Sequence, residues 1–302
     1  MRISYIEKKF HDSSMRLIMI ADQICREYQR KGFDLTLRQL YYQFVARAVI
    51  PNTMQSYKRL GSVLNDARLA GQLDWNYMVD RTRNLQGTTH WKNAEHIISN
   101  AAGNFTMDKW EKQPCRIEVW VEKEALAGVV GQVCSRLDLD FFCCRGYVSQ
   151  SEMWSASNRL NRYIDEGQHV IVLHLGDHDP SGMDMTRDLE DRLMMFEVSP
   201  EDFEMKRIAL NMDQIKKFNP PPKPAKTTDS RYKPYIRKYG TSSWELDALD
   251  PDSLQKIIEE HVRKYRDESS FEIEEKKEQK VKDLLSKVSN SWPDVVDYIE
   301  DL

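Results

Sequence analysis

The chain has 302 residues, 30% of them charged, with a formal net charge of −4, and is long enough for two domains with separate cores. Its five cysteines are an odd number without a C-x-x-C pair, which argues against a disulfide framework and a zinc site. No apolar run approaches membrane-spanning length, and the charged start is not typical of a signal peptide. The sequence therefore predicts a cytoplasmic protein without a membrane partner.

The charge is unevenly divided along the chain. Residues 1–92 contain 15 Lys and Arg against 8 Asp and Glu, whereas the remainder contains 29 against 40. A basic N-terminal part joined to an acidic part fits DNA binding by the first and metal binding by the second. An ordinary solvated surface is the alternative explanation, and the charge distribution alone does not distinguish the two.

The first informative element is an amphipathic helix near the N-terminus. Thr36 can cap a helix from about Leu37 to Val49, and the apolar positions of this helix form one stripe. Tyr41 lies within the stripe, whereas Tyr42 lies outside its centre, one turn after Arg38. We expect Tyr41 to be a core residue and Tyr42 to be presented near the Arg38 guanidinium.

A second, basic helix is expected from about Met54 to Ala70, ended by Gly71. Residues 73–83 follow it and can form a basic wing. A helix, a turn, a basic helix and a wing are the layout of a winged-helix DNA-binding domain. The candidate DNA-binding residues are Lys58, Arg59, Arg68, Arg81 and Arg83.

Strand and helix patterns then alternate. Apolar runs at residues 116–121, 139–145 and 169–173 read as buried strands, each followed by a helical pattern such as that of residues 151–165. Strands that alternate with helices specify a parallel sheet with right-handed crossovers. We therefore predict an α/β, Rossmann-like, mostly parallel sheet for this part of the chain.

Acidic residues follow two of these strands. Glu122 comes after the first strand, and Asp177 and Asp179 come after the last. Ligand sites of open α/β sheets lie at the carboxyl ends of the strands, and carboxylate oxygens suit magnesium better than zinc. Ser181 can cap the next helix, and Gly182 permits close backbone approach. A plain surface turn is the alternative.

The motifs at this edge resemble a Toprim domain, the metal-binding fold of topoisomerases, primases and related nucleases. They are closest to one branch, the topoisomerase VI A subunit and the related meiotic double-strand-break transesterases. The motifs are Glu122-Lys123-Glu124, Arg145-Gly146-Tyr147 and Asp177-His178-Asp179-Pro180-Ser181-Gly182. The resemblance implies a winged-helix domain at residues 1–112, a Toprim domain at residues 113–302, and one or two Mg²⁺ ions held by Glu122, Asp177 and Asp179.

The run Leu37-Arg38-Gln39-Leu40-Tyr41-Tyr42 is also similar to the segment that holds the nucleophilic tyrosine of that family. By this resemblance Tyr42 is the nucleophile, and Arg38 and Lys123 add positive charge near the attacked phosphate. In the family each tyrosine works with the metal site of the partner subunit, which implies a homodimer. Packing of Tyr42 at a domain boundary is the structural alternative.

The expected function is magnesium-dependent cleavage of double-stranded DNA by tyrosine transesterification, as in type IIB topoisomerase A subunits, by a nucleoid-associated protein. No P-loop or glycine-rich phosphate cradle is present, so strand passage would require a separate, B-like ATPase subunit. One alternative is a Toprim nuclease of a defence or mobile-element system that uses water. A second is a non-catalytic DNA-binding accessory protein.

Four further features have uncertain roles. His178 points to the opposite face of an extended strand. Glu245 and Asp247 belong to a solvated strand edge or to a second metal site. Residues 219–228 are expected to be an extended, mobile loop, and residues 272–287 a solvated, charged helix. The basic residues that make the loop a candidate DNA-contacting flap are Lys226, Arg231, Lys233, Arg237 and Lys238.

Overall fold

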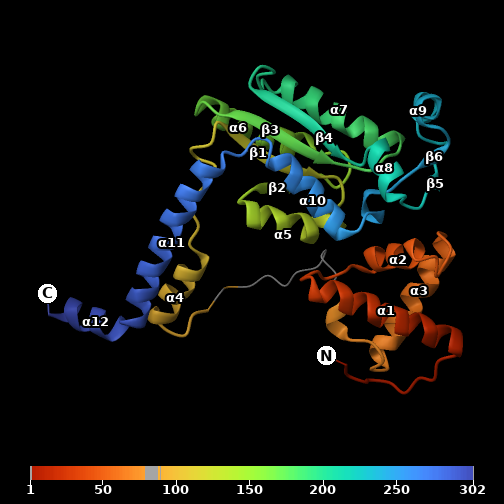
Figure 1. The fold of residues 1–302 in the computed structure, drawn as a ribbon, viewed down its shortest axis with the longest axis horizontal. Coiled ribbons are helices and arrows are strands. Elements are labelled where there is room, and N and C mark those ends of the chain that lie inside the picture. The colour runs from red at the N-terminus through yellow and green to blue at the C-terminus, as the bar shows by residue number, and fades with distance from the viewer. Residues whose placement is uncertain (1, 79–87, 89, 302) are drawn as a thin grey trace.

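The computed structural model describes residues 2–78, 88 and 90–301 of the chain. Its elements form a group of N-terminal helices, a parallel sheet covered on both faces, and a helical arm that extends away from the sheet (Figure 1). Within these described ranges, no helix is both long enough and apolar enough to cross a membrane.

The N-terminal group consists of α1 (Asp12–Arg30), α2 (Leu37–Ala46), α3 (Met54–Leu69) and the short 3₁₀ helix η1 (Trp75–Tyr77). Helix α1 packs against both α2 and α3. Thr36 caps α2 as predicted, in a reciprocal capping box with Gln39. Helix α2 ends at Ala46, short of the predicted Val49, because the chain turns at Ala48, where φ is 54°.

The helical part of the expected winged-helix domain is present, but the wing is not confirmed. In residues 2–78 the only β-type pairings are isolated bridges, between Ser4 and Ala70 and between Leu35 and Met78. Arg81 and Arg83, the basic residues assigned to the wing, lie outside the described residues. A winged helix therefore stays a prediction.

The central sheet confirms the α/β class. Its four parallel strands have the order β2-β1-β3-β4. The first three strands match the predicted ones, whereas β4 was not predicted. Their bounds are β1 (Cys115–Val121), β2 (Asp140–Cys143), β3 (His169–Leu175) and β4 (Phe203–Ala209).

Helices cover both faces of this sheet. The helices α5 (Ala127–Leu137) and α10 (Pro251–Val262) lie on one face, and α6 (Gln150–Asp165) and α7 (Pro180–Met195) on the other (Figure 1). Leu173 packs with the first face and Val172 with the second, and both are fully buried. Because the N-terminal helices share the hydrophobic cluster of the first face, one core links them to the sheet.

The segment after β4 returns to the carboxyl edge of the sheet. It contains α8 (Met212–Phe218), a small antiparallel pair of β5 (Lys223–Pro224) and β6 (Ser242–Ser243), α9 (Tyr232–Tyr239), and η3 (Leu246–Ala248). The predicted mobile flap is therefore wrong in part. Lys233, Arg237 and Lys238 lie on the helix α9, which Tyr235 fixes by its hydrogen bond with His178.

The arm consists of α4 (Ala94–Asn104) packed on α11 (Glu268–Asn290), with α12 (Trp292–Glu300) at its end (Figure 1). Residues 272–287, predicted to be a solvated, charged helix, lie within α11, and the prediction of solvent exposure is wrong for two of them. Glu274 and Glu278 are buried, because Lys112 and Lys109 from the segment before β1 form ion pairs with them.

Candidate active site at the carboxyl edge of the sheet

The ends of β1 and β3 bring the predicted acidic residues together. Val121 and Leu175 are paired in register, and the Glu122 N–H donates a hydrogen bond to the Leu175 carbonyl at 2.8 Å. The Asp177 N–H in turn donates to Glu122 Oε2 at 2.7 Å. Glu122 and Asp177 therefore lie side by side at the edge, as parallel strand ends require.

Asp179 has a structural role in the same turn. Its Oδ1 accepts the Gly182 N–H at 2.7 Å and caps α7, in which Pro180 occupies the first turn. The prediction that Ser181 is the cap is wrong, since Ser181 lies inside the helix. Gly182 is needed for close approach, because an added Cβ would lie 2.4 Å from the Asp177 carbonyl oxygen.

Arg207 of β4 holds this turn in place. Its guanidinium donates to the carbonyl oxygens of Gly176 at 2.8 Å, Asp177 at 2.6 Å and Gly182 at 2.9 Å. Burial lowers the pKa of Arg207. The sequence analysis missed this residue because β4 was not predicted, and only the strand order places it beside β3.

Asp177 is buried, with 7% of its surface exposed. Its Oδ1 accepts the Leu246 N–H at 2.8 Å, and its Oδ2 lies 2.9 Å from the Lys123 ammonium. Burial raises the pKa of Asp177 to about 7; Lys123 opposes this rise and Glu122 adds to it. Burial also raises the pKa of Glu122. Burial therefore disfavours the ionised form of both carboxyl groups.

Two more carboxylates reach this edge from a distant part of the sequence. The backbones of His178 and Trp244 form an antiparallel bridge, which sets Glu245 and Asp247 next to the strand ends. The prediction of a solvated strand edge is wrong: Asp247 is 1% exposed and both residues belong to the turn around η3. The bridge explains this burial, because it holds the segment around η3 against the turn after β3.

Lys123 is surrounded by carboxylates. Its ammonium lies 2.9 Å from Asp177, 3.0 Å from Glu245 and 3.0 Å from Asp247. Although burial lowers the pKa of Lys123, the charges of Asp177 and Asp247 raise it. We call Glu122, Lys123, Asp177, Glu245 and Asp247 the sheet-edge cluster. It contains one ammonium group shared by three carboxylates.

Tyr42 faces this cluster from α2. Its hydroxyl donates to Glu245 Oε2 at 2.8 Å, and Arg38 forms ion pairs with Glu245 and with Asp247. Tyr42 is near the guanidinium, as expected, but it is not at an open edge. It is 2% exposed, against 4% for Tyr41, because η3 packs on α2 and covers that side of the helix.

The electrostatic surroundings of Tyr42 disfavour its ionised form. Burial raises the pKa of its hydroxyl, and the charges of Asp247 and Glu245 raise it further. Burial also raises the pKa of Glu245, but Lys123, Lys223 and Arg38 outweigh it and hold that pKa well below its usual range. Glu245 is therefore ionised, and it accepts the hydrogen bond that orients the Tyr42 hydroxyl.

The donor set of this edge fits a hard cation in its chemistry, but the metal geometry is not assembled. Glu122 and Asp179 each use one carboxylate oxygen in the hydrogen bonds given above and retain a second one. Carboxylate oxygens are the ligands that Mg²⁺ prefers. Among the described residues, however, no three His, Cys, Asp or Glu side chains are grouped so that they could hold one ion.

His178 lies away from the carboxylates, in agreement with the expectation from strand geometry. Its Nδ1 is 2.8 Å from the Tyr235 hydroxyl, and its ring packs edge-on against Tyr239 and Trp244. Burial lowers the pKa of His178 to about 4. A neutral imidazole held by aromatic rings has a structural role here.

The predicted DNA-binding residues of α3 differ in their surroundings. Lys58 and Arg59 are exposed. Arg68 is half-buried, with its guanidinium carbon 5.0 Å from the centroid of the Trp75 ring, and burial lowers its pKa. Lys58 and Arg59 are therefore free to meet phosphates, whereas Arg68 also supports the fold of its own domain.

No protein-family model and no curated protein sequence matches this chain.

Proposed function

We propose that this protein cleaves DNA by transesterification, with Tyr42 as the nucleophile. The observation that supports this most is the contact of the Tyr42 hydroxyl with Glu245, which shares the Lys123 ammonium with Asp177. A tyrosine on one group of helices and carboxylates at the edge of a parallel sheet thus share one site. The resemblance of both motifs to topoisomerase VI A subunits adds to this support.

Positive charge for a phosphate is available at the same place. Arg38 and Lys223 both form ion pairs with Glu245, and Lys123 lies behind them. A DNA phosphate would compete with Glu245 for Arg38 and Lys223. Withdrawal of these cations would make Glu245 more basic, so substrate binding would itself prepare the acceptor for the tyrosine proton.

In the proposed step, the Tyr42 oxygen forms a bond to phosphorus and the bond from phosphorus to a deoxyribose oxygen breaks. The phenolic proton passes to Glu245, and the leaving oxygen takes up a proton from solvent. Arg38 and Lys223 balance the charge that develops on the phosphate oxygens. Mg²⁺, held by Glu122, Asp177 and Asp179, would supply further charge neutralisation when bound.

A second candidate is a nuclease that uses water, with Tyr42 in a structural role. The burial of Tyr42 and its raised pKa favour this alternative, because attack requires the contact between α2 and η3 to open. In both cases the substrate is double-stranded DNA and the sheet-edge cluster is essential. The candidates differ in whether protein remains attached to the cut end.

The test is incubation with supercoiled plasmid and Mg²⁺, stopped with detergent, with and without protease. Under the proposal, DNA ends carry protein until protease is added, and Tyr42→Phe abolishes this product. Tyr41→Phe is the matched control, since the hydroxyl of Tyr41 donates to Asn52 and lies outside the cluster. If the Tyr42→Phe protein cleaves the plasmid at the parental rate and leaves DNA ends without attached protein, the nucleophile is water.

We further propose a homodimer, with a separate ATPase subunit where strand passage occurs. A mixture of Tyr42→Phe and Asp177→Asn proteins tests how the subunits cooperate. Restored covalent product would show that each tyrosine uses the partner's acidic site. No restoration would show that one chain holds both parts, as the contact between Tyr42 and Glu245 within one chain would allow.

A further inference from the structure

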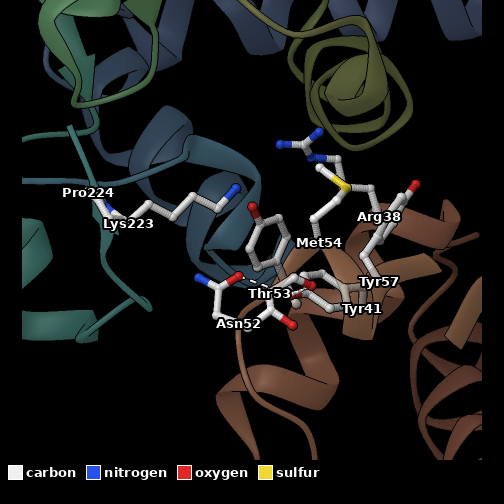
Figure 2. Close-up of a pocket in the computed structure, with 9 residues that line it drawn as sticks. Arg38, Tyr41, Asn52, Thr53, Met54, Tyr57, Lys223 and Pro224 are labelled. Atoms are coloured by element: carbon white, nitrogen blue, oxygen red, sulfur yellow. Dashed lines mark hydrogen bonds between the residues drawn. The ribbon is translucent and has the colours of Figure 1, made fainter. Parts of the chain in front are cut away.

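A cavity of about 410 Å³ is lined by Tyr42 and its neighbours on α2. It is formed by α2, the start of α3 and the strand β5, so both the N-terminal helices and the segment after β4 contribute to it. In Figure 2, Lys223 and Pro224 lie on one side of the cavity and Met54 and Tyr57 on the other. Its volume is within the range of small-ligand sites.

The wall of this cavity is aromatic. The rings of Tyr42 and Tyr57 each lie 5.3 Å from the ring of Tyr41, in edge-to-face geometry. The Tyr41 hydroxyl is already used, since it donates to Asn52 Oδ1 at 3.0 Å and to the Thr53 carbonyl at 3.1 Å. What the wall offers a ligand is mainly the half-buried ring of Tyr57, since Tyr41 and Tyr42 are buried, and ring surface suits a flat aromatic group.

Cations lie around the mouth of the cavity. The Lys223 ammonium is 5.3 Å and the Arg38 guanidinium 5.9 Å from the centroid of the Tyr42 ring. A ligand that combines a flat ring with a negative charge matches this arrangement, and a nucleotide has both parts.

We propose that this cavity receives one unstacked base of the DNA strand, adjacent to the phosphate that Tyr42 attacks. This inference rests on the proposed function, and it names the part of the substrate that the site holds. Tyr42 contributes to both places, since its ring lines the cavity and its hydroxyl meets Glu245. A base stacked in the cavity would hold its own backbone beside that hydroxyl.

The test compares two labelled duplexes that differ only in a single unpaired adenine bulge, with binding followed by fluorescence anisotropy in EDTA so that no strand is cut. An unpaired base is already partly unstacked, so the parent protein should bind the bulged duplex about tenfold more tightly. Tyr57→Ala should remove this preference, and Tyr57→Phe should keep it, because the ring is retained.

Two more variants control for folding. Met54→Ala removes a side chain that is 69% exposed, so it should weaken the preference without affecting stability. Tyr298→Ala, on the distant helix α12, removes an exposed tyrosine of the same type and should change nothing. Thermal melting of each variant checks that the fold is intact.

Equal affinity of the parent for both duplexes, or a preference that survives in Tyr57→Ala and Met54→Ala, would overturn this inference and leave the proposed function intact. A parent protein that binds neither duplex would contradict the proposed function together with this inference.

Discussion

Two clusters of buried charges, one at the base of the arm and one at the edge of the sheet, differ in how their carboxylates are paired. At the base of the arm, Glu278 lies 2.6 Å from Lys109 and 2.6 Å from Lys282, and Glu274 lies close to Lys112 and Lys277. In this α11 cluster each carboxylate has two ammonium partners. In the sheet-edge cluster, Glu245 and Asp247 also pair with Arg38, and Glu245 pairs with Lys223, whereas Asp177 pairs with Lys123 alone among the described residues.

The difference is visible in the pKa values. Although burial raises the pKa of Glu278, hydrogen bonds from Lys109 and Lys282 lower it to about 2. Burial of Asp177 instead raises its pKa to about 7, against the opposing effects of Lys123 and of the hydrogen bond from the Leu246 N–H. A cluster that serves stability is neutralised by its own residues. A carboxyl group whose pKa is raised by burial at the carboxyl edge of a parallel sheet is a candidate functional group.

The largest effect that tests this comparison is expected for Asp177→Asn. The variant should lose DNA cleavage and the rise in melting temperature that Mg²⁺ gives the parent protein. It should keep its fold in EDTA, because an amide oxygen can still accept the Leu246 N–H. Glu278→Gln is the matched control and should retain both the cleavage and the metal response. An equal Mg²⁺ response of parent and Asp177→Asn proteins would refute the metal assignment.

Lys123→Ala should give the next largest effect. Removal of the ammonium leaves three carboxylates close together, so urea unfolding in EDTA should show a loss of about 3 kcal/mol. Mg²⁺ should recover part of that loss by replacing the missing charge. Lys112→Ala removes a lysine whose side chain is 56% exposed and should cost less than about 1 kcal/mol. Similar losses for both variants would remove the distinction between the clusters.

Glu278→Gln should lower the free energy of unfolding by about 2 kcal/mol at neutral pH, because charged hydrogen bonds are lost. The pKa of Glu278 falls from the ordinary value of 4.5 to about 2 in the folded protein. Its contribution is therefore present above pH 4.5 and disappears as the pH falls toward 2. Urea unfolding of parent and variant across this window should show their difference shrinking; a constant difference would exclude a charge effect.

The smallest effects are expected for the charges that belong to neither cluster. If the N-terminal helices bind DNA phosphates, Lys58→Ala and Arg59→Ala should each reduce the slope of log affinity against log salt by about one unit. Arg68→Ala should reduce it less, because Arg68 is half-buried over Trp75. Anisotropy titrations at several salt concentrations measure the slopes. Equal reductions for Arg68 and Lys58 would show that both meet phosphates equally.

Much of the fold could be predicted because its signals are local. The capping box of Thr36 and the apolar stripe specify α2, and continuous apolar runs specify β1 and β3. The strand β4 was missed because it has no continuous apolar run, and the adjacent Lys206 and Arg207 interrupt its alternation of apolar and charged residues. The burial of Glu274 and Glu278 was also missed, because their partners precede β1.

The acidic edge was predicted for the same local reason. Glu122 and Asp177 directly follow strands, so strand pairing alone puts them together. Glu245 was misjudged because its position depends on the bridge between His178 and Trp244. The burial of Tyr42 was misjudged because a helical wheel describes one helix and not the segment that packs on it.

The sequence by itself determined three strands of the parallel sheet, the acidic residues that follow two of them and the cap of α2, because each of these signals lies within a few residues along the chain. Only the tertiary structure decided which groups meet Tyr42, since its partner Glu245 is 203 residues away along the chain. The same holds for Lys123, which lies 122 residues from Glu245. Such contacts leave no periodic signal, because the packing of separate elements forms them.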